Sequence, residues 1–506
     1  MKLFAIAVTV LCVIARAAGD APVPAIQMSD VATPAAPGAV GASLTNAPDG
    51  TGWLSWIEPA PSAPSLPAPA DARVLRVSTF DLTAHRWSAP HTVASGASLA
   101  ADPTDFPQLA VNARGEAIAL WADGHGGAWL SRSKDRGTTW SSTEPFTRDG
   151  SDTEKFSLAV LADDRVLIAW LDGRGKKAGG KTQRLYARIL GADGPDTLVD
   201  PSVCDCCQTT LTAFPDGGAL LAYRGRTEEE VRDIRTARFR GTGWDDPRPL
   251  GADDWRLNAC PVNGPRLAGD GGRVAAAWFT ASNNDPRVLA SFSPDAGARF
   301  LQPLRVDHGK PSGHVDTLLL HDGALLVTWL EADGSLWLRR ITPDFTADAP
   351  IALSPAGAGR VSGFPRTALV HDYAGGKTSA QFIAAFVRED SPATLHTLLV
   401  TVPEGELLNA EKNCDCAPTP EQLVGFPMRG TIVALDADAG SVRVRHDEVP
   451  GVLGAGVHEF SVAPDVVAAA SRGRQFLGRI ERRDGQWRLF DVRLFVTPAP
   501  AAGSRP

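Results

Sequence analysis

Cysteine thiols are the side chains in this chain whose spacing points most directly to chemistry. Cys204, Cys206 and Cys207 fall within four residues, and Cys260 lies further along the chain. Thiolates that converge on one point bind soft ions such as Cu(I) or Zn(II). In an exported protein cysteines also form disulfides, and here one bridge from Cys206 or Cys207 to Cys260 is expected. Metal binding, disulfide formation and a redox-active thiol all remain open for this cluster.

Thiol and imidazole side chains gather a second time near the C-terminus, at Cys414, Cys416, His446 and His458. Sulfur and imidazole nitrogen are donors that both copper and zinc accept. The expected cofactor is therefore copper or zinc, held by one or both of these clusters.

Arginines form a third group that could bind a ligand. Arg224, Arg226 and Arg232 lie close in sequence and are followed by Asp233, and Arg366 lies far downstream. A guanidinium group binds carboxylate through two parallel hydrogen bonds, so a small anionic ligand is an alternative partner to a metal ion. The acidic residues between Arg226 and Arg232 also allow a second interpretation, in which these arginines form salt bridges on a solvated loop.

Short strands must position these residues, because one two-strand signature recurs seven times. Each copy is a β-run that ends in an aromatic residue, a polar turn and a second β-run. The aromatic residues are Trp56, Trp121, Trp170, Tyr223, Trp278, Trp329 and Phe386. Their spacing of roughly 50 to 65 residues is in the range of a four-stranded propeller blade. Four of them have an acidic residue two positions on, for which we expect a role in building the blade: Glu58, Asp123, Asp172 and Glu331.

A more specific motif follows two of these strands. Ser133–Trp140 and Ser293–Phe300 fit Ser-x-Asp-x-Gly-x-x-Trp/Phe, which resembles the Asp-box, or BNR repeat, of sialidase-like β-propellers. The resemblance covers residues 38 to 403 and implies six or seven blades. It places the Asp-box turns at one end of the propeller. The loops that carry Cys204 to Cys207, Cys260 and the arginines are expected at the other end, on the face where a site would lie.

The same resemblance implies an exo-acting glycoside hydrolase as an alternative function. A sialidase needs three arginines, a tyrosine nucleophile activated by a glutamate, and an aspartate acid/base. Arg224, Arg226, Arg232 and Asp233 are the candidates here, with Tyr373 as the one tyrosine placed in a turn. The Arg-Ile-Pro motif that opens sialidases is absent, since the first blade has Arg73-Val74-Leu75 instead.

The pattern changes after a linker at residues 404–425. Five short strands between residues 426 and 496 predict a small OB-like barrel. The segment from Gly430 through His446 to Val462 resembles the small periplasmic copper-binding barrels of cation-efflux systems. His446 matches that family's histidine ligand, whereas its two methionine positions fall on Gly456 and His458. The resemblance therefore implies copper, with an altered ligand set.

The two ends of the chain are expected to lie outside these domains. Residues 1–18 read as a signal peptide, 19–37 as a disordered leader and 497–506 as a disordered tail, so the protein is expected to be periplasmic or secreted. No later segment is apolar for long enough to span a membrane. A net charge of -8 gives no reason to expect a nucleic-acid partner. The oligomeric state is not indicated.

The sequence as a whole predicts an all-β protein in which a sialidase-like propeller is followed by a small barrel. The function we expect is binding of a soft metal ion, with copper favoured, through cysteine and histidine clusters. A glycoside hydrolase and a disulfide-stapled binding scaffold remain as alternatives.

Overall fold

The computed structural model describes the residues numbered 26–61, 72–96, 99–100, 102–147, 152–354, 363–371, 379–388, 391–403, 426–446, 449, 453–470, 472, 475–483 and 486–494. Strands dominate this part of the chain, as predicted. The helical elements among the described residues are short: α1 (Arg174–Lys177), η1 (Ser282–Asn284) and α2 (Pro464–Ala469). None of them is long and apolar enough to cross a bilayer.

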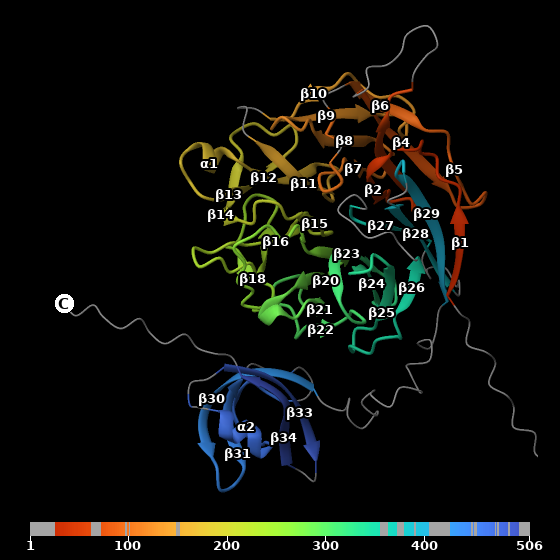
Figure 1. The fold of residues 1–506 in the computed structure, drawn as a ribbon. Coiled ribbons are helices and arrows are strands. Elements are labelled where there is room, and N and C mark those ends of the chain that lie inside the picture. The colour runs from red at the N-terminus through yellow and green to blue at the C-terminus, as the bar shows by residue number, and fades with distance from the viewer. Residues whose placement is uncertain are drawn as a thin grey trace, which may run out of the picture.

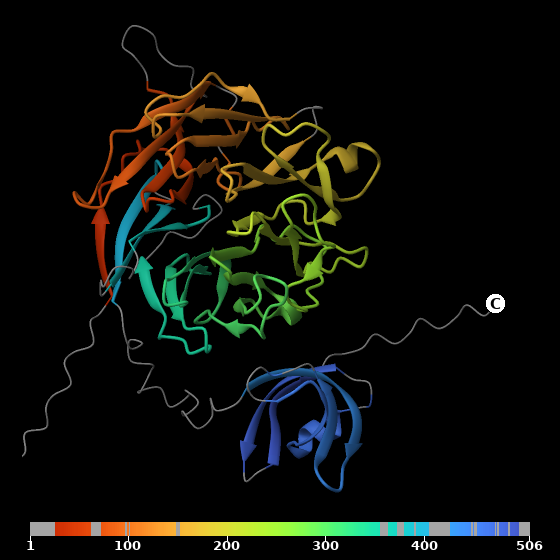
Figure 2. The same cartoon turned by 180° about the vertical axis from the view of Figure 1, so that it is seen from behind.

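The described residues up to Pro403 form seven antiparallel sheets. The sequence alone did not decide between six and seven blades. Figure 1 shows them in a ring, and Figure 2 shows the same ring from behind. The first sheet holds β2 (Val40–Asn46), β3 (Gly52–Pro59), β4 (Arg73–Asp81), β5 (Arg86–Trp87) and β6 (His91–Gly96). The second holds β7 (Gln108–Val111), β8 (Ala117–Ala122), β9 (Ala128–Ser133) and β10 (Glu144–Pro145).

The next four sheets repeat the same order of four strands. The third holds β11 (Thr153–Val160), β12 (Val166–Asp172), β13 (Gln183–Ile189) and β14 (Thr197–Val203). The fourth holds β15 (Thr210–Ala213), β16 (Ala219–Arg224), β17 (Ile234–Phe239) and β18 (Arg248–Pro249). The fifth holds β19 (Arg266–Asp270), β20 (Arg273–Thr280), β21 (Arg287–Ser293) and β22 (Leu304–Arg305). The sixth holds β23 (Pro311–Leu319), β24 (Leu325–Glu331), β25 (Leu336–Ile341) and β26 (Ile351–Ser354).

The seventh sheet joins the two ends of the ring. It combines β27 (Arg366–His371), β28 (Ser379–Arg388) and β29 (Thr394–Pro403) with β1 (Gln27–Val31) from the start of the described chain. The expectation of disorder over residues 19–37 is therefore wrong for this strand, because its backbone pairs with β29. The first strands of successive sheets also contact one another all the way round, including β27 with β2. This closed circle of antiparallel sheets is the architecture of a β-propeller.

The recurring aromatic residues lie on the second strand of each sheet, where the sequence placed them. The side chains of Trp56, Trp170, Trp278 and Trp329 are at most 1% exposed. Three of these indoles donate to a buried carboxylate: Trp56 to Glu58 at 2.6 Å, Trp170 to Asp172 at 2.9 Å and Trp329 to Glu331 at 2.8 Å. These acids therefore help to build the sheets.

The two Ser-x-Asp-x-Gly turns follow the third strands β9 and β21. The Ser133 hydroxyl accepts the Gly137 N–H at 2.9 Å, and Asp135 accepts the Thr139 N–H at 2.9 Å. Ser293 and Gly297 repeat the first of these bonds at 2.7 Å. Both glycines have φ near +80° to +90°, a conformation that few other residues adopt at low cost.

The strands after residue 425 close into a separate barrel. Its order is β30 (Phe426–Asp436), β31 (Ser441–His446), β32 (Gly456–Ser461), β34 (Gln486–Leu494) and β33 (Gln475–Arg483). The interior holds Met428, Ile432, Val444, Phe460 and Phe476. The five strands expected from the sequence are therefore present.

Candidate functional site

The loop that carries three cysteines links the third and fourth sheets. It runs from β14 into β15, and Cys260 lies in the loop that leads into β19, the first strand of the fifth sheet. The Cys204 N–H donates to the Arg224 carbonyl at 3.0 Å, which fixes the start of the loop against the end of β16. Cysteines and arginines thus lie at the same end of the propeller, as expected.

One disulfide joins the two loops. Cys206 is bonded to Cys260, with 6.2 Å between their Cα atoms. This is one of the two bridges that the sequence allowed. Cys204 and Cys207 are free thiols and are 1% and 2% exposed.

The two free thiols and the bridged sulfur of Cys206 converge. The Sγ atom of Cys204 lies 2.7 Å from that of Cys207 and 3.9 Å from that of Cys206. All three Sγ atoms lie within 4.8 Å of one another. Two thiolates on one ion with metal–sulfur bonds near 2.3 Å can be at most roughly 4.6 Å apart. The Cys204–Cys207 and Cys204–Cys206 sulfur distances are both shorter than this limit.

The pKa values of the two free thiols are shifted in opposite directions. A hydrogen bond from Cys207 holds the pKa of Cys204 down to about 6, against burial, with help from the Cys206 amide and the charges of Arg224 and Arg232. Burial raises the pKa of Cys207, and the hydrogen bond and charge of Cys204 raise it further. Of the two sulfurs in this contact, Cys204 is therefore the more acidic and Cys207 the less acidic.

The guanidinium group of Arg224 is buried behind this pair at 1% exposure. It donates to three backbone carbonyls, those of Asn263 at 2.8 Å, Arg232 at 2.5 Å and Phe279 at 2.6 Å. Its carbon atom Cζ also lies 4.8 Å from the centre of the Trp255 ring. Through these contacts Arg224 links the fourth sheet to the fifth. A role for Arg224 as an anion ligand stays a prediction.

Arg226 and Arg232 share an acidic partner. Glu230 accepts from Arg226 at 2.7 Å and from Arg232 at 2.7 Å. This matches the second interpretation of the arginine group, with salt bridges among neighbours. Asp233 accepts the N–H groups of Asp254 and Trp255, both at 3.0 Å, and burial raises its pKa.

Asp205 organises the cysteine loop, and only its place between two cysteines points to it in the sequence. Its carboxylate accepts the Gln183 N–H at 2.9 Å and pairs with Arg226 at 2.9 Å and Lys176 at 3.1 Å. The central residue of the Cys-Asp-Cys triplet is thus held by three elements, while the flanking sulfurs point into the cluster.

The two cysteine-bearing loops are packed closely. A Cβ atom at Gly264 would lie 2.0 Å from the Gln208 carbonyl oxygen. The backbone N–H of Asn263 reaches the Cys207 sulfur and favours its charged form. Glycine at position 264 therefore lets the backbone after Cys260 approach the backbone after Cys207.

A buried lysine lies beside this centre and was not singled out from the sequence. Lys155 in β11 has φ of +54°, and its ammonium lies 3.7 Å from Asp105 and 3.3 Å from Glu154. Burial raises the pKa of Asp105 to about 6, against the attraction of Lys155. The Lys155 carbonyl accepts from Thr209, two residues after Cys207, at 3.0 Å.

Arg366 and His314 lie further round the same face. Arg366 is 2% exposed, and burial together with the charge of Arg266 lowers its pKa to about 9. The His314 ring stacks on Phe364 at 4.4 Å, and its Nδ1 lies 2.7 Å from the Gly363 carbonyl oxygen. Within the described part of the chain, neither side chain forms a hydrogen bond or ion pair with a cysteine of this cluster.

The barrel brings its two histidines together. The Nε2 atom of His446 lies 2.8 Å from the Nδ1 atom of His458 across the β31–β32 pair, and His446 is 5% exposed. Cys414, Cys416 and Tyr373 lie outside the described residues. Their predicted roles as ligands and nucleophile stay predictions.

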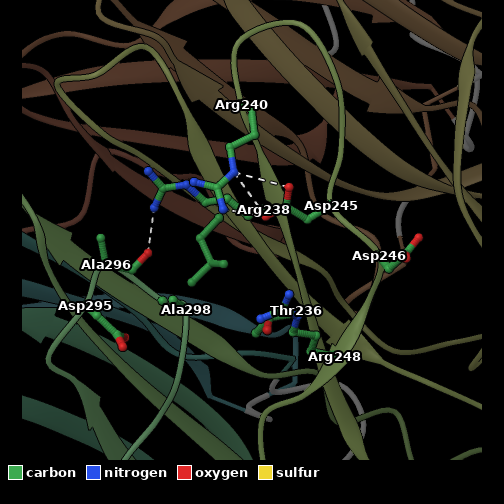
Figure 3. A pocket seen from close by; sticks show the side chains of 11 residues that line it. Thr236, Arg238, Arg240, Asp245, Asp246, Arg248, Asp295, Ala296 and Ala298 are labelled. Atoms are coloured by element: carbon green, nitrogen blue, oxygen red, sulfur yellow. Dashed lines mark hydrogen bonds and ion pairs between the residues drawn. The ribbon is translucent and has the colours of Figure 1, made fainter.

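A cavity of about 130 Å³ lies away from the cysteines. It is lined by Leu220 of β16, by Thr236 and Arg238 of β17, by residues that follow β17 and by the Asp295–Ala298 turn. It therefore lies toward the opposite end of β17 from Arg224. Figure 3 shows Arg240 paired with Asp245 and Arg238 directed at the Ala296 carbonyl. A shallower hollow beside the cysteine loop is lined by Asp200–Ser202, Arg226–Glu228, Arg235 and Pro247.

Comparison with known proteins gives similarity of structure only. No protein-family model and no curated protein matches the chain. It is similar to the BP39L lectin of Burkholderia pseudomallei, with 11% identity and a TM-score of 0.49 over 74% of this chain and 98% of the lectin. It is also similar to the NanB sialidase of Streptococcus pneumoniae, with 12% identity and a TM-score of 0.39 over 72% of this chain and 68% of the sialidase.

A third similar structure is the α-L-arabinanase of Penicillium chrysogenum, with 12% identity and a TM-score of 0.38 over 60% of this chain and 94% of the arabinanase. Similarity at this level carries no information about activity. The assignment to the β-propellers therefore depends on the ring of sheets described above.

Proposed function

We propose that the propeller binds one soft metal ion, Cu(I) in preference to Zn(II), at Cys204, Cys206, Cys207 and Cys260 when the cluster is reduced. The convergence of three Sγ atoms within 4.8 Å carries this proposal. Soft thiolate ligands select Cu(I) and Zn(II) over hard cations. Reduction of the disulfide would free a fourth sulfur, that of Cys260, next to the other three.

The surroundings suit a cluster of negatively charged sulfurs. The positive charges of Arg224 and Arg232 act on Cys204, and that of Arg224 also acts on Cys207. The backbone amides of Cys206 and Asn263 add hydrogen bonds to the two sulfurs. Buried charge is expensive unless it is compensated, and these groups supply the compensation. A bound ion would add Lewis acidity and a redox or storage function, according to its identity.

Metal analysis under reducing, anaerobic conditions tests the proposal. Reduced protein is loaded with Cu(I) or Zn(II), desalted and assayed for metal and protein. We expect close to one equivalent of copper in the propeller. In Cys204→Ser and Cys207→Ser the affinity should fall by at least about tenfold, because each variant removes a ligand. Retention of less than about a tenth of an equivalent of either metal by the unmodified protein would sink the proposal.

Matched variants in the barrel separate the two clusters. His446→Ala with His458→Ala, combined with serine at positions 414 and 416, removes every expected barrel ligand. The propeller ion should remain in this variant. The 2.8 Å approach of the two imidazoles favours a second, weaker copper or zinc site in the barrel. Loss of a second equivalent in this variant alone would support that site.

The contacts of Arg226 and Arg232 do not favour the glycoside-hydrolase alternative. A glycoside hydrolase would need free guanidinium groups, whereas Arg226 and Arg232 are paired with Glu230. Location in the periplasm or outside the cell is part of the proposal, since disulfides such as Cys206–Cys260 form and persist there. Protease protection in intact and in osmotically shocked cells tests that location.

A further inference from the structure

We infer that the propeller cysteines form a two-pair thiol–disulfide relay, in which the disulfide moves between the exposed pair Cys206–Cys260 and the buried pair Cys204–Cys207. This inference concerns exchange among the sulfurs themselves and does not depend on metal binding. The inference depends on the distances between the sulfur atoms and on the solvent exposure of each cysteine.

Cys204 lies between the two pairs. Its sulfur is 3.9 Å from Cys206, one atom of the disulfide, and 2.7 Å from the free sulfur of Cys207. A disulfide isomerises when a neighbouring thiolate attacks one of its sulfurs. Cys204 has a disulfide sulfur on one side and a second thiol on the other. It can therefore exchange first with Cys206 and then with Cys207, which transfers the disulfide from one pair to the other.

The two pairs differ in access to solvent. Cys260 is exposed and Cys206 is half-buried, whereas Cys204 and Cys207 are 1% and 2% exposed. An external thiol or disulfide can therefore react at Cys260, and only the internal exchange can bring an oxidising equivalent to the buried pair. A disulfide that merely staples the two loops would need no buried dithiol beside it.

The exchange balances in two steps without any added reagent. In the first, the Cys204 thiolate bonds to the Cys206 sulfur, the Cys206–Cys260 bond breaks, and Cys260 leaves as a thiolate that takes a proton from water. In the second, Cys207 loses its proton and bonds to Cys204, and Cys206 leaves as a thiolate that is protonated in turn. One disulfide and two thiols are present before and after, so no net oxidation occurs.

The backbone holds the participants in place during the exchange. Asp205 is bound by Lys176 and Arg226, and the close approach at Gly264 fixes the loop after Cys260 against the loop after Cys207. The sulfurs can thus change partners by side-chain rotation while the loops stay where they are. The positive charge of Arg224 acts on both buried sulfurs and favours the thiolates that form there.

Trapping of Cys260 tests the relay. Cys12, Cys414 and Cys416 are replaced by serine in every variant, and the folded protein is treated with iodoacetamide without reductant and without oxygen. Peptides are then mapped by mass spectrometry after acid quenching and digestion without reduction. We expect Cys260 to become alkylated with time while a disulfide accumulates between Cys204 and Cys207.

Two variants separate the steps. In Cys204→Ser the attacking sulfur is gone, so the rate of Cys260 alkylation should fall at least about tenfold. In Cys207→Ser the first step remains, so Cys260 should still be alkylated, with the disulfide now between Cys204 and Cys206. The relay is wrong if Cys260 stays unmodified in the parent protein, or if it reacts equally fast in Cys204→Ser.

A folding control keeps these outcomes interpretable. The Cys206–Cys260 bridge and the tryptophan fluorescence of each variant are compared with those of the parent before treatment. The position of the disulfide in Cys207→Ser is a second readout, and a product with Cys206 still bonded to Cys260 would also overturn the relay. Metal binding to the reduced protein is measured separately, so either proposal can fail while the other stands.

Discussion

Arg224 shows how one buried side chain supports the cysteine cluster. Its guanidinium binds three carbonyls that belong to the loops and strands around the cluster, and its charge lowers the pKa of Cys204 and opposes the rise at Cys207. Hydrogen bonds to a charged group inside a protein are stronger than those between neutral groups. The residue is thus both a structural tie and a source of positive potential for the sulfurs.

Replacement of this arginine should affect stability and thiol chemistry together. Arg224→Met removes a charged donor that three backbone carbonyls share, so we expect the free energy of unfolding to fall by about 3–5 kcal/mol. The pKa of Cys204 should rise, measured by the pH dependence of its alkylation rate in reduced protein. Arg240→Met is the control, because Arg240 forms a solvent-exposed ion pair with Asp245 whose loss should leave stability nearly unchanged. Equal losses of stability in the two variants would contradict this role.

Asp348 gives a pH-dependent prediction. Burial raises its pKa to about 6, against the attraction of Arg340 and Arg339, and its Oδ1 atom has no hydrogen-bond partner among the described residues. The folded state therefore binds this proton more tightly than the unfolded chain does. The resulting stability is present at low pH and is lost as the pH rises from about 4 through about 6.

Asp348→Asn removes this penalty. The variant should be more stable than the parent above pH 7, by about 1–3 kcal/mol, and the difference should shrink toward pH 4. Urea denaturation at several pH values measures it. A difference between variant and parent that is the same at every pH would show that Asp348 does not titrate in this way.

The strands were predictable from the sequence because their signals are local. Each blade repeats a β-run that ends in an aromatic residue, and the indole–carboxylate bonds of Trp56, Trp170 and Trp329 explain why an acid follows two positions on. Tyr223 breaks this rule, and the structure shows why. Its hydroxyl donates to Asp200 at 2.6 Å, so no acid is needed two positions on, where Gly225 stands.

The contacts between blades were less predictable. Nothing in the sequence indicated that Lys155 would be buried beside Asp105, or that Asp205 would join three elements. The choice of Cys206 over Cys207 for the bridge also depends on where two loops from different sheets meet. Such contacts depend on how the sheets pack rather than on a periodic pattern, so only the proximity of Cys260 to the other cysteines could be expected.

The packing of the two cysteine loops gives a prediction for one element. Gly264→Ala places a methyl group 2.0 Å from the Gln208 carbonyl oxygen, so the loops must move apart. We expect a loss of about 1–3 kcal/mol in stability, together with slower alkylation of Cys260 in the relay experiment. Gly243→Ala is the control, because no atom lies within 4 Å of a Cβ atom there. Unchanged alkylation in Gly264→Ala would show that the relay tolerates displacement of the loops.

On the scale of the whole molecule, β1 joins the two ends of the ring. Its residues pair with β29, with Val31 opposite Thr397, and the Thr397 hydroxyl donates to the Val31 carbonyl at 2.9 Å. Val31 is 7% exposed and belongs to the apolar cluster that contains Trp56. Closure of the ring therefore involves both backbone pairing and burial.

A charge in the closing strand should open the ring. Val31→Asp buries a carboxylate without a partner, so the free energy of unfolding should fall by about 2–4 kcal/mol. Met28→Asp on the same strand is the control, since Met28 is 44% exposed and its replacement should change stability by less than about 0.5 kcal/mol. Denaturation followed by tryptophan fluorescence measures both. Similar stability of the two variants would mean that β1 contributes little to closure.

The position of β1 also has a consequence for the order of events during folding. A ribosome releases Gln27–Val31 long before the partner strand Thr394–Pro403, and the paired residues Val31 and Thr397 are 366 positions apart. Contacts this distant in sequence form late, because the entropy of the intervening loop is lost before they stabilise anything. The nascent chain should therefore pass through an open arc with unpaired strands at both ends, so protection from aggregation matters most just before synthesis reaches β29.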